Sequence, residues 1–166
     1  MDVTTVFNAD ELSALLSAPA VASAIIALAS PSGPIGTVKE ATASATALAA
    51  LVQTPVENEL LAGLGAYLKA QMDNRDELKE QMDLKLDPKD PELKAKMFGK
   101  LGALNEALTK VSAEDAAAYK QWTYTVAVKA AEAGKEGAFL GIGGVKVSDE
   151  EKAALAEIAK TLGIEA

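Results

Sequence analysis

Apolar residues recur at intervals of three and four along most of the chain, the spacing that places them on one face of an α-helix. The most regular run is Leu93, Met97, Leu101, Leu104, Leu108 and Val111. No Asn-Gly or Asp-Gly pair separates alternating apolar and polar runs, as it would in a β-hairpin. We therefore expect an all-α fold, in which residues 1–166 form a single-domain compact bundle of about seven helices.

Capping residues, prolines and glycines predict where the first helices begin and end. Asn8 or Asp10 is placed to cap a short first helix, and Pro19 marks the first turn of a second helix. Two prolines and two glycines within residues 30–36 indicate a loop. A capping-box pattern then predicts that the next helix begins at Thr37.

The highly charged middle of the chain predicts a helical hairpin. Apolar spacing from Leu60 to Leu86 indicates one long helix, and Pro88 and Pro91 indicate a turn. The regular apolar run from 93 to 111 then forms the returning arm. The sequence leaves open whether this arm packs within the chain or across a dimer.

Local signals also define the last two helices. Ser112, with Asp115 three residues later, is placed to cap a helix that carries Tyr119. A capping box at Ser148 predicts the start of the final helix, and Gly163 predicts its end.

Composition removes most familiar chemistry. The chain has no histidine and no cysteine, and 16 basic against 24 acidic residues give a formal net charge of −8. The commonest general base, the thiolate nucleophile and the nitrogen and sulfur ligands of zinc are therefore missing. An acidic protein also lacks the electrostatic footprint that binds nucleic acid. We expect a non-enzymatic protein with no nucleic-acid partner, although chemistry by lysine, tyrosine or carboxylates remains open.

The N-terminal region predicts a cytoplasmic location. The first residues lack the positive region of a secretory signal. The most apolar stretch, 12–29, contains three serines and Pro19, which favours core helices over a membrane span.

Two segments, 33–40 and 144–151, share the pattern G-x-x-x-[ST]-x-x-E between predicted helices. A glycine loop before a capping box produces this pattern, and a duplicated helix-loop-helix is the alternative. Segment 143–164 contains the second copy and continues into an Ala/Leu/Ile helix that ends in Leu-Gly. This segment resembles the signature of the TerB-like tellurite-resistance family. The other copy, 27–41, is looser. The resemblance implies a compact, cytoplasmic, all-helical domain associated with stress and tellurite resistance.

The resemblance also indicates where a cation would bind. Family members place an Asp-Gly pair in each loop, within an acidic cluster suspected of binding a divalent cation, whereas this chain has Ser32-Gly33 and Gly143-Gly144. Glu40 and Glu151 remain at the glutamate positions. Calcium takes about six to eight oxygen ligands, so two carboxylates need carbonyls and water beside them. Glu40 and Glu151 are therefore either two helix caps or part of a site for calcium or another divalent cation.

A final candidate is the apolar, glycine-rich segment that carries Phe139, Leu140 and Ile142. Such side chains either tuck under the domain or form a docking loop for a partner protein or a membrane surface. Our leading hypothesis is a non-enzymatic protein-interaction module without a cofactor, acting near the two loops. The alternative hypothesis is a carboxylate-based, calcium-like divalent-cation sensor.

Overall fold

The computed structural model describes residues 1–29, 34–54, 56–82, 87, 89–133 and 147–164, with only the backbone for 34–42, 75 and 79. Within these ranges the chain forms helices and no strand, which confirms the all-α prediction. The helices are α1 (Val3–Val6), α2 (Ala9–Ala29), α3 (Pro34–Gln53), α4 (Glu59–Ala70), α5 (Arg75–Met82), α6 (Leu93–Ala107), η1 (Leu108–Lys110, a 3₁₀ turn), α7 (Ala113–Ala133) and α8 (Asp149–Leu162).

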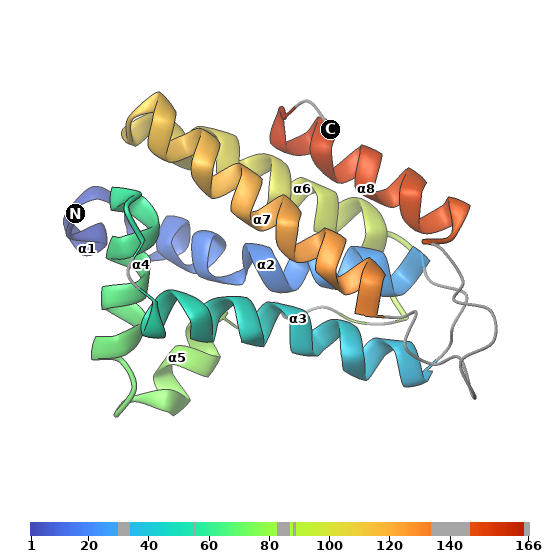
Figure 1. Cartoon of the computed structure of the whole chain (residues 1–166), viewed down its shortest axis with the longest axis horizontal. Coiled ribbons are helices and arrows are strands. Elements are labelled where there is room, and N and C mark those ends of the chain that lie inside the picture. The colour runs from blue at the N-terminus through green and yellow to red at the C-terminus, as the bar shows by residue number, and fades with distance from the viewer. Residues whose placement is uncertain (30–33, 55, 83–86, 88, 134–146, 165–166) are drawn as a thin grey trace.

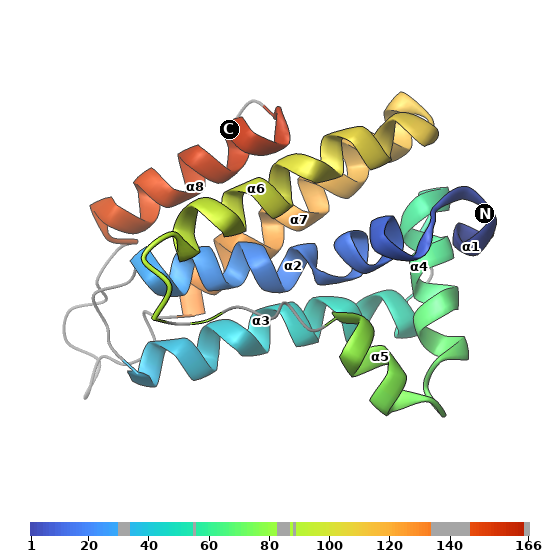
Figure 2. The same cartoon turned by 180° about the vertical axis from the view of Figure 1, so that it is seen from behind.

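Helix α2 is the centre of the bundle. It packs against α3, α6, α7 and α8, and Figures 1 and 2 show it between these helices from both sides. Among the described residues it is the one helix long and apolar enough to cross a membrane, and 61% of its most apolar window is buried inside the fold. A core helix passes the same test of length and composition, and α2 supplies a large part of this core.

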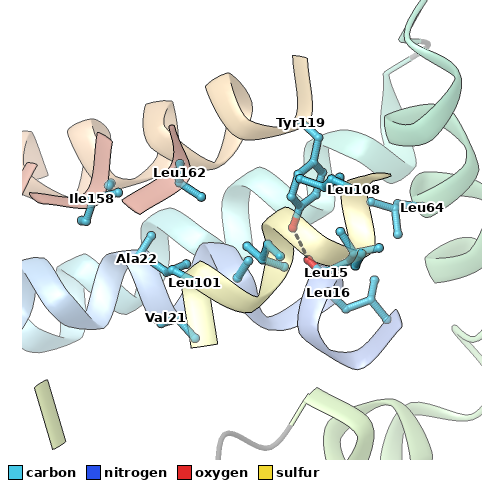
Figure 3. Packing of buried hydrophobic residues seen from close by; sticks show 14 of the residues in the cluster. Leu15, Leu16, Val21, Ala22, Leu64, Leu101, Leu108, Tyr119, Ile158 and Leu162 are labelled. Carbon is cyan, nitrogen blue, oxygen red and sulfur yellow. Dashed lines mark hydrogen bonds between the residues drawn. The ribbon is translucent and has the colours of Figure 1, made fainter. Parts of the chain in front are cut away.

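Pro19 lies inside α2, so the prediction that it marks the start of a second helix is wrong. A proline has no N–H, which leaves the carbonyl of Leu15, four residues earlier, without its helical donor. The hydroxyl of Tyr119 in α7 donates to that carbonyl at 2.6 Å, as Figure 3 shows. Burial raises the pKa of Tyr119 far above its ordinary value, which keeps the hydroxyl protonated as a donor. The helix continues through the proline because another helix supplies the missing donor.

The first helices begin at side-chain caps. Asp2 caps the short α1, and Asn8 caps the long α2 instead of a short first helix. Asn8 Oδ1 accepts from the backbone N–H of Glu11, and Glu11 Oε2 accepts from the N–H of Asn8, both at 2.9 Å. This reciprocal pair satisfies two of the donors that a helix N-terminus leaves free.

The caps predicted for α7 and α8 are confirmed. Ser112 Oγ accepts from the N–H of Asp115 at 3.0 Å at the start of α7. Ser148 and Glu151 form a complete capping box at the start of α8. Gly163 ends α8 with φ of +69°, a left-handed conformation that glycine adopts without strain.

Helix α3 begins at Pro34, three residues before the predicted start at Thr37. Proline is well suited to the first turn of a helix, because the N–H that it lacks has no helical partner there. Thr37 is therefore inside the helix. The two copies of the G-x-x-x-[ST]-x-x-E pattern thus differ in structure, since the copy at 144–151 begins a helix at its serine and the copy at 33–40 does not begin one at its threonine.

The predicted hairpin is wrong. The chain turns between α4 and α5, where the N–H of Asn74 donates to the carbonyl of Gln71 at 2.9 Å. Aspartate and asparagine favour turns, although the apolar spacing is the same on both sides. Helix α6 does not return along α4 and α5 but packs on α2 and α8. Its apolar run is therefore buried within the chain, including Met97, Leu101 and Leu104.

Candidate functional site

The structure tests the sequence-predicted site residues only in part. Phe139, Leu140 and Ile142 lie outside the described residues, and so does the side chain of Glu40. Glu151 is buried, 6% exposed, and its carboxylate accepts from the N–H of Ser148 at 2.8 Å. Glu151 thus acts as a helix cap. Within the described part of the chain, no group of three or more acidic side chains is placed to hold a metal ion.

The structure instead reveals an apolar groove at the end of the bundle where α4 lies. It is bounded by α3, α4 and α5, which Figures 1 and 2 show beside one another, and its volume is about 360 Å³. This volume falls within the range of about 300 to 1,000 Å³ found for ligand sites. The lining consists of eight apolar residues and one amide: Ala45, Leu48, Ala49, Val52, Gln53, Leu68, Met72, Leu78 and Met82.

The wall made by α3 and α4 is closely packed, because the two helices contact each other directly. Ala45, Leu48, Ala49 and Val52 form one stripe of α3 with helical spacing. Gly65 of α4 lies very close to α3. A Cβ atom added to Gly65 would stand 2.4 Å from the backbone carbonyl oxygen of Leu51. Only glycine allows this approach of one helix to the backbone of another.

A second hollow continues this wall. It lies between the end of α3 and α4, has a volume of about 420 Å³, and shares Val52 and Gln53 with the groove. Its lining also includes Val56 and Lys69. The hollowed surface therefore extends from α5 around the C-terminal end of α3, where Gln53, Thr54 and Lys69 add polar groups to it.

The third wall, α5, packs on the core through Leu78 and Met82 and is also held by two hydrogen bonds to Gln81. The hydroxyl of Ser13 in α2 donates to the backbone carbonyl of Gln81 at 2.5 Å. The hydroxyl of Tyr67 in α4 donates to Oε1 of the same glutamine at 2.9 Å. Leu78 and Met82 supply the apolar face of this eight-residue helix, and both are only partly buried. Gln81 thus fixes α5 over a groove that its apolar side chains do not fill.

Exposure and chemistry both indicate binding at this groove. Met72, between α4 and α5, is 47% exposed. Methionine is flexible and polarisable, and it is common at surfaces that adapt to apolar partners. The lining contains no titratable side chain, so the groove offers apolar contact and one amide and no acid or base for catalysis.

A smaller cavity of about 250 Å³ lies between α2 and α6. Asp10 and Lys100 line it together with Ser13 and Ser17. Both hydroxyls already donate within the protein, Ser13 to Gln81 and Ser17 to the carbonyl of Ala14 at 3.3 Å. This cavity therefore offers fewer free groups to a ligand than its composition indicates.

Sequence reasoning missed the groove because its residues look like core residues. Leu48, Val52, Leu68 and Met72 recur at the helical spacing that is typical of core-facing residues. The available signal was Leu78 and its neighbours, where large apolar residues occur inside a highly charged segment. Such a segment cannot cover much apolar surface.

Comparison with known proteins adds no relative. No family model matches the chain, and no match is found among curated proteins or among solved structures.

Proposed function

We propose that this protein is a non-enzymatic interaction module that receives an apolar segment of a partner protein in the groove between α3, α4 and α5. The observation that carries the proposal is the partly exposed apolar lining around Met72 and Leu78, because a contiguous exposed apolar patch on a folded protein is typical of a contact surface. An interaction module was also the leading hypothesis from the sequence, although that hypothesis placed the contact near the two loops.

The setting of this function follows from the sequence alone. A cytoplasmic location and a role in stress or tellurite resistance stay predictions of the composition and of the TerB-like resemblance. The cation-sensor alternative needs Glu40 and Glu151 to converge, and the carboxylate of Glu151 already serves as a cap. We therefore favour the interaction module over the sensor.

Site-specific photo-cross-linking in cells tests the proposal. A photoreactive amino acid replaces Met72 in one variant and Leu28 in another, because both are exposed apolar residues, at 47% and 53%. Leu28 is the next-to-last residue of α2, and Figure 1 shows that α2 ends at the side of the bundle away from α4. We expect a discrete protein adduct at position 72 that mass spectrometry identifies, and no matching adduct at position 28.

A second substitution, in the wall of the groove opposite Met72, tests whether the adduct forms through the groove. Leu48→Ser changes the opposite wall of the groove and should reduce the yield at position 72. Equal adducts at positions 72 and 28, or no adduct at position 72, would contradict the proposed function.

A further inference from the structure

The surroundings of the groove are acidic. Segment 43–82, which supplies the whole lining, holds about a quarter of the residues and a net charge of −3 out of the −8 of the chain. Its three basic residues are Lys69, Arg75 and Lys79. Its six carboxylates are all exposed, and none forms an ion pair with a side chain that the structure describes: Glu57, Glu59, Asp73, Asp76, Glu77 and Glu80. Four of these carboxylates, those of residues 73, 76, 77 and 80, belong to α5 and to the turn before it, which also supply Met72, Leu78 and Met82 to the groove. Unpaired carboxylates beside an apolar surface favour a positively charged partner.

The dimensions of the groove match a short stretch of helix. Its α3 wall runs from Ala45 to Gln53, which at about 1.5 Å per residue spans roughly 12 Å. Apolar anchors at positions i, i+4 and i+7 of a bound helix span about 10.5 Å. Met72 and Met82 stand at the α4 and α5 sides, where their flexible side chains can adjust to such anchors.

Resting on the proposed function, we infer that the partner segment is a basic amphipathic helix. Its apolar side chains occupy the groove between α3, α4 and α5, and its lysines or arginines lie against the carboxylates of α5 and of the adjoining turn. A second copy of this chain is disfavoured because it would bring net charges of −8 together. An anionic membrane surface is disfavoured for the same reason.

Three synthetic peptides of about 18 residues test the inference. All carry leucine at the same helical positions, and the remaining positions are mainly lysine in one peptide, glutamate in the second and glutamine in the third. Binding of each fluorescent peptide to the full chain is followed by anisotropy. We expect the lysine peptide to bind at least tenfold more tightly than the glutamate peptide. Its affinity should fall as salt rises, since a Debye length of about 10 Å at 0.1 M screens exposed charges.

Matched variants locate the binding. Met72→Ser should weaken the lysine peptide and the glutamine peptide alike, whereas Leu28→Ser should weaken neither. Joint substitution Glu77→Gln and Glu80→Gln should weaken only the lysine peptide, by about threefold or more. The pair Glu132→Gln and Glu150→Gln removes the same charge from exposed positions on α7 and α8 and should have no such effect.

The outcomes separate this inference from the proposed function. Equal binding of the lysine and glutamate peptides would overturn the basic helix and leave the groove as an interaction site. If no peptide binds but a protein adduct forms at position 72 in cells, the occupant is not a helix of this kind. Dimerisation that Met72→Ser abolishes, or binding to vesicles of anionic phospholipid that the same variant abolishes, would replace the inferred partner.

Discussion

Helices α2 and α7 pack on each other through apolar faces, and α5 turns an apolar face toward the groove that it helps to form. These two regions differ in how completely their apolar side chains are buried. Where α2 meets α7, Tyr119 is fully buried, and even the carbonyl released by Pro19 has a donor. Where α5 meets the groove, Leu78 and Met82 are only partly buried.

Helix length and coverage explain this difference. Helices α2 and α7 each have 21 residues and are covered by several neighbours, whereas α5 has eight residues and packs mainly on α2. A short, mostly charged helix cannot bury much apolar area, so little of the folding free energy depends on it. The α2–α7 region therefore contributes more to stability than the α5 region, where the apolar side chains stay partly exposed.

Truncation of one leucine in each region gives the largest expected contrast. Leu15 of α2 is fully buried, so Leu15→Ala should lower the free energy of unfolding by about 2–5 kcal/mol. Leu78 is partly buried, so Leu78→Ala should cost about 1 kcal/mol or less. Urea denaturation of both variants measures the difference. Equal losses in the free energy of unfolding would contradict the difference between the two regions, because α5 would then belong to the stabilising core.

The effects of substitutions at Tyr119 in α7 and at Pro19 in α2 on stability should depend on each other. Tyr119→Phe leaves the buried carbonyl of Leu15 without a donor and should cost about 1–3 kcal/mol. In a Pro19→Ala background the backbone N–H at position 19 can donate to that carbonyl, so the same substitution should cost less. A double-mutant cycle from urea denaturation measures the coupling. The same cost in both backgrounds would show that the tyrosine hydroxyl does not compensate for the proline.

The carboxylate that joins α7 to α4 should make this region acid-sensitive. Asp115 accepts from the hydroxyl of Ser112 at 2.7 Å and from the N–H of Leu60 at 3.3 Å. The hydrogen bond from Ser112 is the main cause that holds the pKa of Asp115 below its usual value of 3.8. Because the folded pKa is the lower one, the stabilisation is complete above about pH 3.8 and is lost as pH falls through the folded pKa.

We therefore expect Asp115→Asn to be less stable than the natural chain near pH 6, and the gap should narrow below pH 3.8. Urea denaturation at a series of pH values measures the gap. Ser112→Ala removes the first cause of the shift and should reduce the same acid-dependent loss. A gap that does not change with pH would exclude a contribution from the ionised carboxylate.

Loosening α5 should have the smallest effect on global stability and a clear local one. Gln81→Ala removes the hydrogen bond from Tyr67 and should cost about 1 kcal/mol or less. Amide hydrogen exchange within α5 should nevertheless become faster, while exchange in α2 should stay unchanged. Gln121→Ala, at an exposed position of α7, serves as the control. Unchanged exchange in α5 would show that the bond from Tyr67 to the Gln81 side chain does not hold the helix in place.

Local features of the sequence were reliable because they act within a few residues. The cap at Ser112, the capping box at Ser148 and the glycine at 163 each involve contacts three or four residues away, and all three occur as predicted. The start of α3 was misplaced because the capping-box pattern at Thr37 competed with a proline that suits the first turn equally well.

The sequence by itself determined the helical class, most helix faces and the absence of histidine and cysteine chemistry, since periodicity and composition are local or additive properties. The tertiary structure alone decided which faces meet. The donor for Leu15 comes from a residue 104 positions away, and α6 packs on α2 and α8 instead of along α4 and α5. The groove has the same origin, because a leucine or methionine with helical spacing is core or surface according to how much of it the neighbouring helices can cover.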